Sequence, residues 1–191
     1  AYRRPMQAND VKGLMTFYDE GAKAGGFEMG IRTALEALLS SPHFIFRIEE
    51  VPTVATKGRV AVNGVDLASR LSFFLWGAPP DSQLVALGRM GRLNDTTVLV
   101  SQAKRMLADP RSEALATRFA SQWLRLQDIE LVHPDANQFP DFREQLATDM
   151  RRETELFFYN LVRENRSLND LFTANYTYVN EALAKLYDIP G

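Results

Sequence analysis

Residues 139–163 read FPDFREQLATDMRRETELFFYNLVR, and this stretch decides the fold because it holds the longest helical pattern in the chain. Its apolar side chains recur at steps of three, four or seven residues, which places them on one face of a helix. These residues are Phe142, Leu146, Met150, Phe157 and Leu161. At ~1.5 Å per residue, a helix over about 140–163 would span a small domain. We therefore expect the other helices to pack around it.

One acid interrupts the apolar face of this helix. Glu153 follows Met150 by three residues and precedes Phe157 by four, so it falls on the same stripe. An unpaired buried charge is strongly unfavourable, and a carboxylate in such a position is either paired or catalytic. The role of Glu153 is the main functional question that the sequence raises.

A catalytic role for Glu153 would need a second carboxylate. Glu155 is two residues away and points in another direction on a helix, so the two cannot act together as an acid–base pair. Asp149 and Asp170 are the other candidates for this second carboxylate. A polysaccharide-active enzyme with Glu153 in an open groove near a second carboxylate is therefore one hypothesis.

A structural role for Glu153 is the favoured interpretation. Arg70 lies three residues after Leu67 and four before Phe74, so it also falls on an apolar stripe. A buried pair between Arg70 and Glu153 would satisfy both charges and fix the register of two helices.

The rest of the chain alternates amphipathic helical patterns with short connections. Asn9 or Asp10 can begin the first helix, Gly25-Gly26 interrupt it, Ser41-Pro42 restart it, and Asn63 or Asp66 and Asp81 can open later ones. A single helix is expected over 112–127, with Leu115, Phe119, Trp123 and Leu126 in one row. No segment is a confident strand. The sequence predicts an all-α, irregular or orthogonal bundle of eight or nine helices.

The composition shifts once, at residues 51–62, VPTVATKGRVAV, where Pro, Thr, Gly and β-branched residues replace helix formers. This stretch predicts a linker. It separates a small helical N-terminal module over 1–50 from a main helical domain over 63–191.

Composition excludes several functional classes. The 191 residues carry a net charge of −2, which provides no basic field for nucleic acid. The densest apolar run, Leu71–Trp76, is far shorter than the ~20 residues of a membrane span. No cysteine is present, so these residues contain no disulfide, thiolate metal site or covalent haem attachment.

Motifs for metals and cofactors are also missing. His43 and His133 have no partner at ligand spacing, and no phosphate-binding loop, dinucleotide motif or serine nucleophile motif occurs. We therefore predict no catalytic, metal or cofactor site within these residues.

Clustered aromatic residues indicate contact with a partner. Three consecutive aromatic residues on a helix cannot all face one core, and the residues that we expect to face another domain are Phe73, Trp76, Phe158 and Tyr159. The alternative is that these helices are buried on several sides and need aromatic residues all round.

Four stretches in order resemble a known pair of domains: LASRLSFFLWGAPPD, QWLRL, MRRETELFF and SLNDLFTANYTYVNEALAKLYDIPG. The chain is similar to two adjacent domains of unknown function in large extracytoplasmic proteins of planctomycete type, which usually also carry a c-type cytochrome domain. AYRRP through FIFRIEE resembles the smaller first module, and roughly residues 60–191 resemble the second. The resemblance carries no catalytic residues, because the activity of such proteins is not established.

The resemblance implies a periplasmic or extracellular location and haem c elsewhere in a longer parent protein. We expect a non-catalytic helical module that contacts other domains of the parent chain or of a protein complex. Besides the polysaccharide-active enzyme, a subunit at the periplasmic face of a membrane electron-transfer complex is a further alternative.

Overall fold

The fold comes from a computed structural model that describes residues 6–46, 49 and 62–190. All regular secondary structure in this part of the chain is helical and it contains no strand, which confirms the predicted all-α class. The predicted linker over 51–62 lies outside the described residues except for Val62.

The contacts within the chain define two units. Unit 1 comprises Ala1–Arg70 and Asp81–Asp95, and unit 2 comprises Leu71–Pro80 and Thr96–Gly191. The division falls within helix α3, Gly64–Trp76. Each unit is described by itself.

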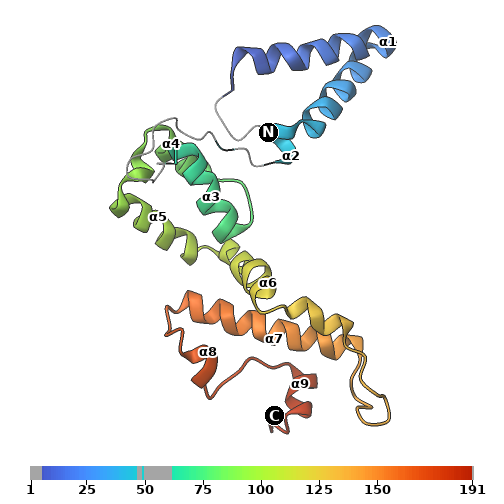
Figure 1. The fold of residues 1–191 in the computed structure, drawn as a ribbon, viewed down its shortest axis with the longest axis vertical. Helices are drawn as coiled ribbons and strands as arrows, with labels where there is room; N and C mark the ends of the chain where they lie inside the picture. The colour runs from blue at the N-terminus through green and yellow to red at the C-terminus, as the bar shows by residue number, and fades with distance from the viewer. Residues whose placement is uncertain (1–5, 47–48, 50–61, 191) are drawn as a thin grey trace. The chain divides into compact units, whose positions relative to one another are not determined.

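Unit 1 begins with α1, Ala8–Ser40, which bends sharply at Gly25 and Gly26 (Figure 1). Gly26 has a φ of 78°, a left-handed value that favours glycine. The two arms of α1 approach closely, because a Cβ on Gly30 would lie 2.7 Å from the ring of Tyr18. The predicted interruption at this glycine pair is confirmed. Helix α2, Pro42–Ile45, follows with the expected Pro at its start.

In the remainder of unit 1, the backbones of α3 and α4 lie in close contact. Helix α4, Ser82–Arg89, approaches the start of α3 so closely that a Cβ on Gly64 would lie 2.2 Å from the carbonyl oxygen of Gly88. Asn63 accepts hydrogen bonds from the first turn of α3, and Asp81 caps α4. The short helix η1, Arg92–Asn94, ends this part of the unit.

Unit 2 contains α5, Thr96–Ala108, and then a broken helical stretch. Its segments are η2 (Pro110–Ser112), the π-helix η3 (Leu115–Ala120), α6 (Ser121–Trp123) and η4 (Leu126–Leu131). The single helix expected over 112–127 is therefore wrong. The i→i+5 hydrogen bonds of η3 change the direction in which the following side chains point. The helix ends before Arg125, which has a left-handed φ of 55°.

The residues of the expected row differ in burial. Leu115 is buried, but Phe119 and Trp123 are exposed, and the small residues Ala116 and Ala120 lie in the core instead. The π-helical turn explains the change, because it rotates later residues away from the row that a regular α-helix would give.

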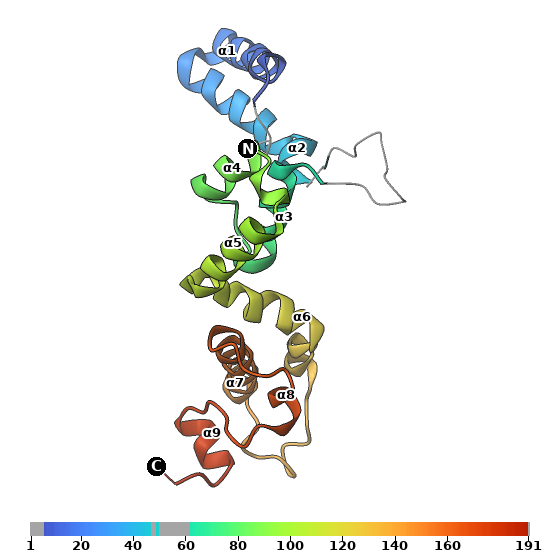
Figure 2. The same cartoon turned by 90° about the vertical axis from the view of Figure 1, so that its left-hand side faces the viewer.

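Helix α7, Glu144–Arg163, contains 20 residues without interruption. It starts later than the predicted position near 140, because residues 135–142 form turns before it. Helices α8, Asp170–Thr173, and α9, Glu181–Leu186, follow, and α9 lies beside α7 in both views (Figures 1 and 2). Contacts with η3 and η4 cover another side of α7, so this helix has neighbours on two sides.

Candidate functional site

The buried acid of α7 is Glu155, two residues beyond the one that the sequence indicated. Glu155 is 6% exposed, whereas Glu153 is only half-buried. The hydroxyl of Ser121 on α6 donates a hydrogen bond of 2.9 Å to Glu155. Arg151 Nε donates a second bond of 3.1 Å, and Arg152 Nη1 donates a longer one of 3.4 Å. Glu155 is therefore a paired carboxylate.

The two arginines extend this pairing to other segments. Arg151 Nη1 lies 2.8 Å from Glu130 of η4, and Arg152 Nη2 lies 2.5 Å from Glu113. The hydrogen bond to Glu155 is the largest cause that raises the pKa of Arg151, and the bond to Glu113 does the same for the pKa of Arg152. We call these two arginines together with Ser121 and the three acids the Glu155 network. It joins α7 to the chain on either side of η3 and α6.

Glu153 lies on the other face of α7 and accepts hydrogen bonds from hydroxyl groups. Thr177 Oγ1 donates to one carboxylate oxygen at 2.5 Å, and the hydroxyl of Tyr187 donates to the other at 2.8 Å. Burial, followed by the bond to Glu153, raises the pKa of Tyr187 to about 12. These bonds connect α7 to the segment that contains α9.

The structure gives Arg70 a different partner from the predicted one. Arg70 Nε donates a hydrogen bond of 2.7 Å to Glu49, and the same carboxylate pairs with Arg70 Nη2. The bond to Glu49 raises the pKa of Arg70. Arg70 pairs with Glu49 within unit 1, and the hydrogen bonds to Glu153 come from Thr177 and Tyr187 within unit 2.

Two of the four aromatic residues predicted to face a partner belong to the core of unit 2. Trp76 is 3% exposed and Phe158 is 6% exposed, which corrects that prediction for both. The indole of Trp76 donates a hydrogen bond of 2.9 Å to the carbonyl of Met106, and the guanidinium of Arg111 lies 3.5 Å from its ring centroid. Phe73 and Tyr159 are half-buried.

The aromatic residues exposed on unit 2 include three neighbouring ones that the sequence did not indicate as facing a partner. Phe74, Phe119 and Trp123 are 54%, 42% and 57% exposed, and we call them the aromatic row. The rings of Phe119 and Trp123 stack with centroids 6.0 Å apart, and Phe74 meets Phe119 edge-on at 5.6 Å. The positions of Phe119 and Trp123 depend on the π-helical turn, which helical periodicity alone does not predict.

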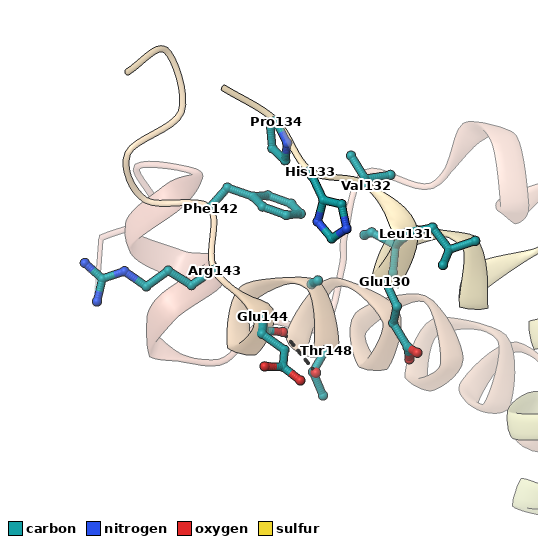
Figure 3. Close-up of a pocket in the computed structure, with 11 residues that line it drawn as sticks. Glu130, Leu131, Val132, His133, Pro134, Phe142, Arg143, Glu144 and Thr148 are labelled. Carbon is teal, nitrogen blue, oxygen red and sulfur yellow. Dashed lines mark hydrogen bonds between the residues drawn. The ribbon is translucent and has the colours of Figure 1, made fainter. Parts of the chain in front are cut away.

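A hollow with a volume of about 720 Å³ lies in unit 2 between η4 and the start of α7 (Figure 3). His133 and Phe142 project towards each other across it, while Arg143 points away. Its apolar wall includes Ile129, Leu131 and Ala147. His133 is exposed and lies in the connection between η4 and α7.

A second hollowed region runs along α7 beside α9. One part, of about 440 Å³, is lined by Asp149, Glu153 and Tyr178 among others, and the adjoining part, of about 460 Å³, is lined by Asp149, Leu146 and Leu186 among others. Because Asp149 lines both parts, we call them together the α7–α9 groove. Glu153 therefore lies in a groove with a second carboxylate.

Within residues 6–46, 49 and 62–190, no group of three or more His, Cys, Asp or Glu side chains is arranged to hold a metal ion. In the same part of the chain, no helix combines the length and the apolar character that crossing a membrane requires.

Two family models match successive parts of the chain. A family model, PSD4, described as a protein of unknown function (DUF1592), matches residues 62–189. The chain belongs to the PSD4 family. A second model, PSD5, also described as a protein of unknown function (DUF1595), matches residues 1–49, before the PSD4 region. The predicted pair of adjacent domains of unknown function is thereby confirmed. Searches of curated proteins and of solved structures gave no match to the chain.

Both faces of α7 lie within the PSD4 region. The Glu155 network, the aromatic row and the α7–α9 groove all fall between residues 62 and 189.

Proposed function

We propose that this chain is a non-catalytic helical module that mediates contacts within a larger extracytoplasmic protein carrying a c-type cytochrome domain. The Glu155 network is the observation that carries the proposal. A buried carboxylate that serves catalysis must reach substrate, whereas Glu155 is bonded to Ser121 and to two arginines on the protein side. The buried charge of α7 is thus used to hold helices together.

The aromatic row supports the contact role. Large aromatic side chains are enriched where proteins meet, and three neighbouring rings exposed on one unit form an apolar surface suited to another domain of the parent chain. The paired PSD5 and PSD4 matches fit a protein built from several modules. The proposed cytochrome and the proposed extracytoplasmic location rest on the resemblance of the chain to planctomycete-type proteins.

The test is a visible absorption spectrum of the intact parent protein, purified from its natural source with an antibody against this chain. We expect a reduced-minus-oxidised spectrum with haem c bands and release of the protein with the extracytoplasmic fraction. A parent protein without haem, or one that remains with cytoplasmic markers, would contradict the proposed context.

A polysaccharide-active enzyme is the second candidate, because Glu153 and Asp149 line one groove. Hydrolysis by two carboxylates requires an acid and a base or nucleophile across the scissile bond. Both oxygens of Glu153 accept bonds from protein hydroxyls, which favours the non-catalytic role. Release of reducing sugar from polysaccharide by the purified chain, abolished in both Glu153→Gln and Asp149→Asn, would establish the enzyme instead.

A further inference from the structure

The α7–α9 groove has an apolar floor and a length suited to a short peptide. Leucine side chains contributed by both helices line it, and these are Leu146, Leu156, Leu183 and Leu186. The lining positions on α7 run from Gln145 to Leu156, which spans ~16 Å at the helical rise. An extended chain of about five residues covers this distance.

Within the described residues, two acids in the middle of the groove have no cationic partner in an ion pair. Asp149 accepts a hydrogen bond of 2.9 Å from the amide of Gln145, and Glu153 accepts bonds only from the two hydroxyls. Within the described residues, neither carboxylate forms an ion pair. Because they lie four residues apart on one helix, their charges repel each other. A cation bound between them would relieve this repulsion.

The basic residues that line the groove do not supply this cation. Lys185 pairs with Glu181 at 2.6 Å, and Arg152 belongs to the Glu155 network. Arg143 lines the same part of the groove as Asp149, but Asp141 lines that part as well, so the single positive charge of Arg143 faces two acids there. The charge that remains unbalanced at the centre of the groove is therefore negative.

We propose that the α7–α9 groove binds a basic, amphipathic peptide segment of a partner protein. Apolar side chains of the segment would lie on the leucine floor, and lysine or arginine side chains would reach Asp149 and Glu153. Recognition of an amphipathic segment by an apolar groove with complementary charge is a common mode of peptide binding. The inference rests on the proposed contact role of the chain and names the chemistry of one partner.

The experiment measures binding of a fluorescent ten-residue peptide of alternating leucine and lysine to the whole chain by anisotropy. Its matched control is the same peptide with glutamate in place of lysine. We expect the lysine peptide to bind at least tenfold more tightly than the glutamate peptide, and its binding to weaken with added salt. Asp149→Asn keeps the acceptor for Gln145 and should weaken binding of the lysine peptide about fivefold.

The matched protein control is Glu144→Gln, which removes one negative charge from α7 outside the groove. It should change the affinity less than twofold, and circular dichroism should show the same helix content for both variants. Equal affinity for the two peptides, or equal effects of Asp149→Asn and Glu144→Gln, would overturn the proposal. If the peptide causes the chain to dimerise and Asp149→Asn does not change this dimerisation, the proposal is also overturned.

The two proposals fail separately. A haem-free parent protein combined with tight lysine-peptide binding would reject the proposed context and retain the groove. A haem-containing parent protein whose PSD4 domain does not distinguish the two peptides would retain the context and reject the groove.

Discussion

The two faces of α7 use their acids in different ways. On the side of η3 and α6, Glu155 is buried and bonded by two arginines and a serine hydroxyl. On the side of α9, Glu153 is half-buried and bonded by two uncharged hydroxyls. The same residue type two positions apart therefore stabilises a core on one face and leaves negative charge in a groove on the other.

The difference follows from what each face contacts. A buried carboxylate requires charged partners, because desolvation of an ion without them is strongly unfavourable. A carboxylate at the edge of a groove retains access to water and needs only hydrogen-bond donors. The face of Glu155 therefore stabilises unit 2, and the face of Glu153 carries the groove for which we propose a binding role.

The largest expected contrast concerns the two adjacent phenylalanines. Phe158 is buried and meets Phe119, whereas Phe157 is half-buried and stacks on Tyr176 with centroids 5.3 Å apart. Phe158→Ala should lower the free energy of unfolding by about 3–4 kcal/mol, and Phe157→Ala by about half as much. Urea unfolding followed by tryptophan fluorescence measures both, since Trp76 and Trp123 are the only tryptophans and both belong to unit 2. Equal losses of unfolding free energy for Phe158→Ala and Phe157→Ala would contradict the expected difference.

A smaller effect is expected from the serine of the Glu155 network. Ser121→Ala removes a hydrogen bond to a buried carboxylate and should lower the free energy of unfolding by about 1–2 kcal/mol. Thr148→Ala is the matched control, because Thr148 is exposed on α7 and its hydroxyl donates a hydrogen bond to the carbonyl of Glu144 on the same helix. A loss no greater than that of the control would show that Ser121 does not support Glu155.

The smallest effect should come from the hydroxyl on the groove side. Tyr187→Phe removes one bond to Glu153 near the surface and should lower the free energy of unfolding by about 0.5 kcal/mol. The same urea experiment measures it. A loss as large as that of Ser121→Ala would remove the distinction between the two faces.

The pKa of Tyr187 gives this face a pH dependence. Its value of about 12 in the folded chain lies above the ordinary 10.0, so the folded state keeps a proton that the unfolded state has lost. The stability that this proton provides is fully present below pH 10 and is lost as the pH rises from about 10 to about 12. Tyr187→Phe should lose less stability than the wild type over this interval. If the free energy of unfolding depends on pH in the same way for the two proteins, the raised pKa of Tyr187 is contradicted.

Local sequence signals predicted much of the fold. The glycine pair at 25–26, the Pro at the start of α2 and the caps at Asn63 and Asp81 each have a short-range physical cause, and the structure contains all of them. The end of the long helix at Arg163 was also predicted. Such features depend on a few neighbouring residues and are therefore visible in the sequence.

The buried acid was not predictable from the apolar pattern. The core side of α7 combines Ala147, Arg151, Glu155 and Phe158, a row with one small and two charged members that hydrophobic periodicity does not detect. The spacing of Glu155 four residues after Arg151 and three before Phe158 is the signal that would have identified it. Its serine partner comes from α6, whose position follows the unpredicted π-helix.

The central claim is that Glu155, and not Glu153, is the acid that holds the PSD4 domain together. The most direct test is urea unfolding of Glu155→Gln and Glu153→Gln, compared with the wild type by tryptophan fluorescence. We predict that Glu155→Gln lowers the free energy of unfolding by about 2 kcal/mol, because two partly exposed arginines lose their buried counterion, and that Glu153→Gln lowers it by less than about 0.5 kcal/mol. Equal losses, or a larger loss for Glu153→Gln, would contradict the account.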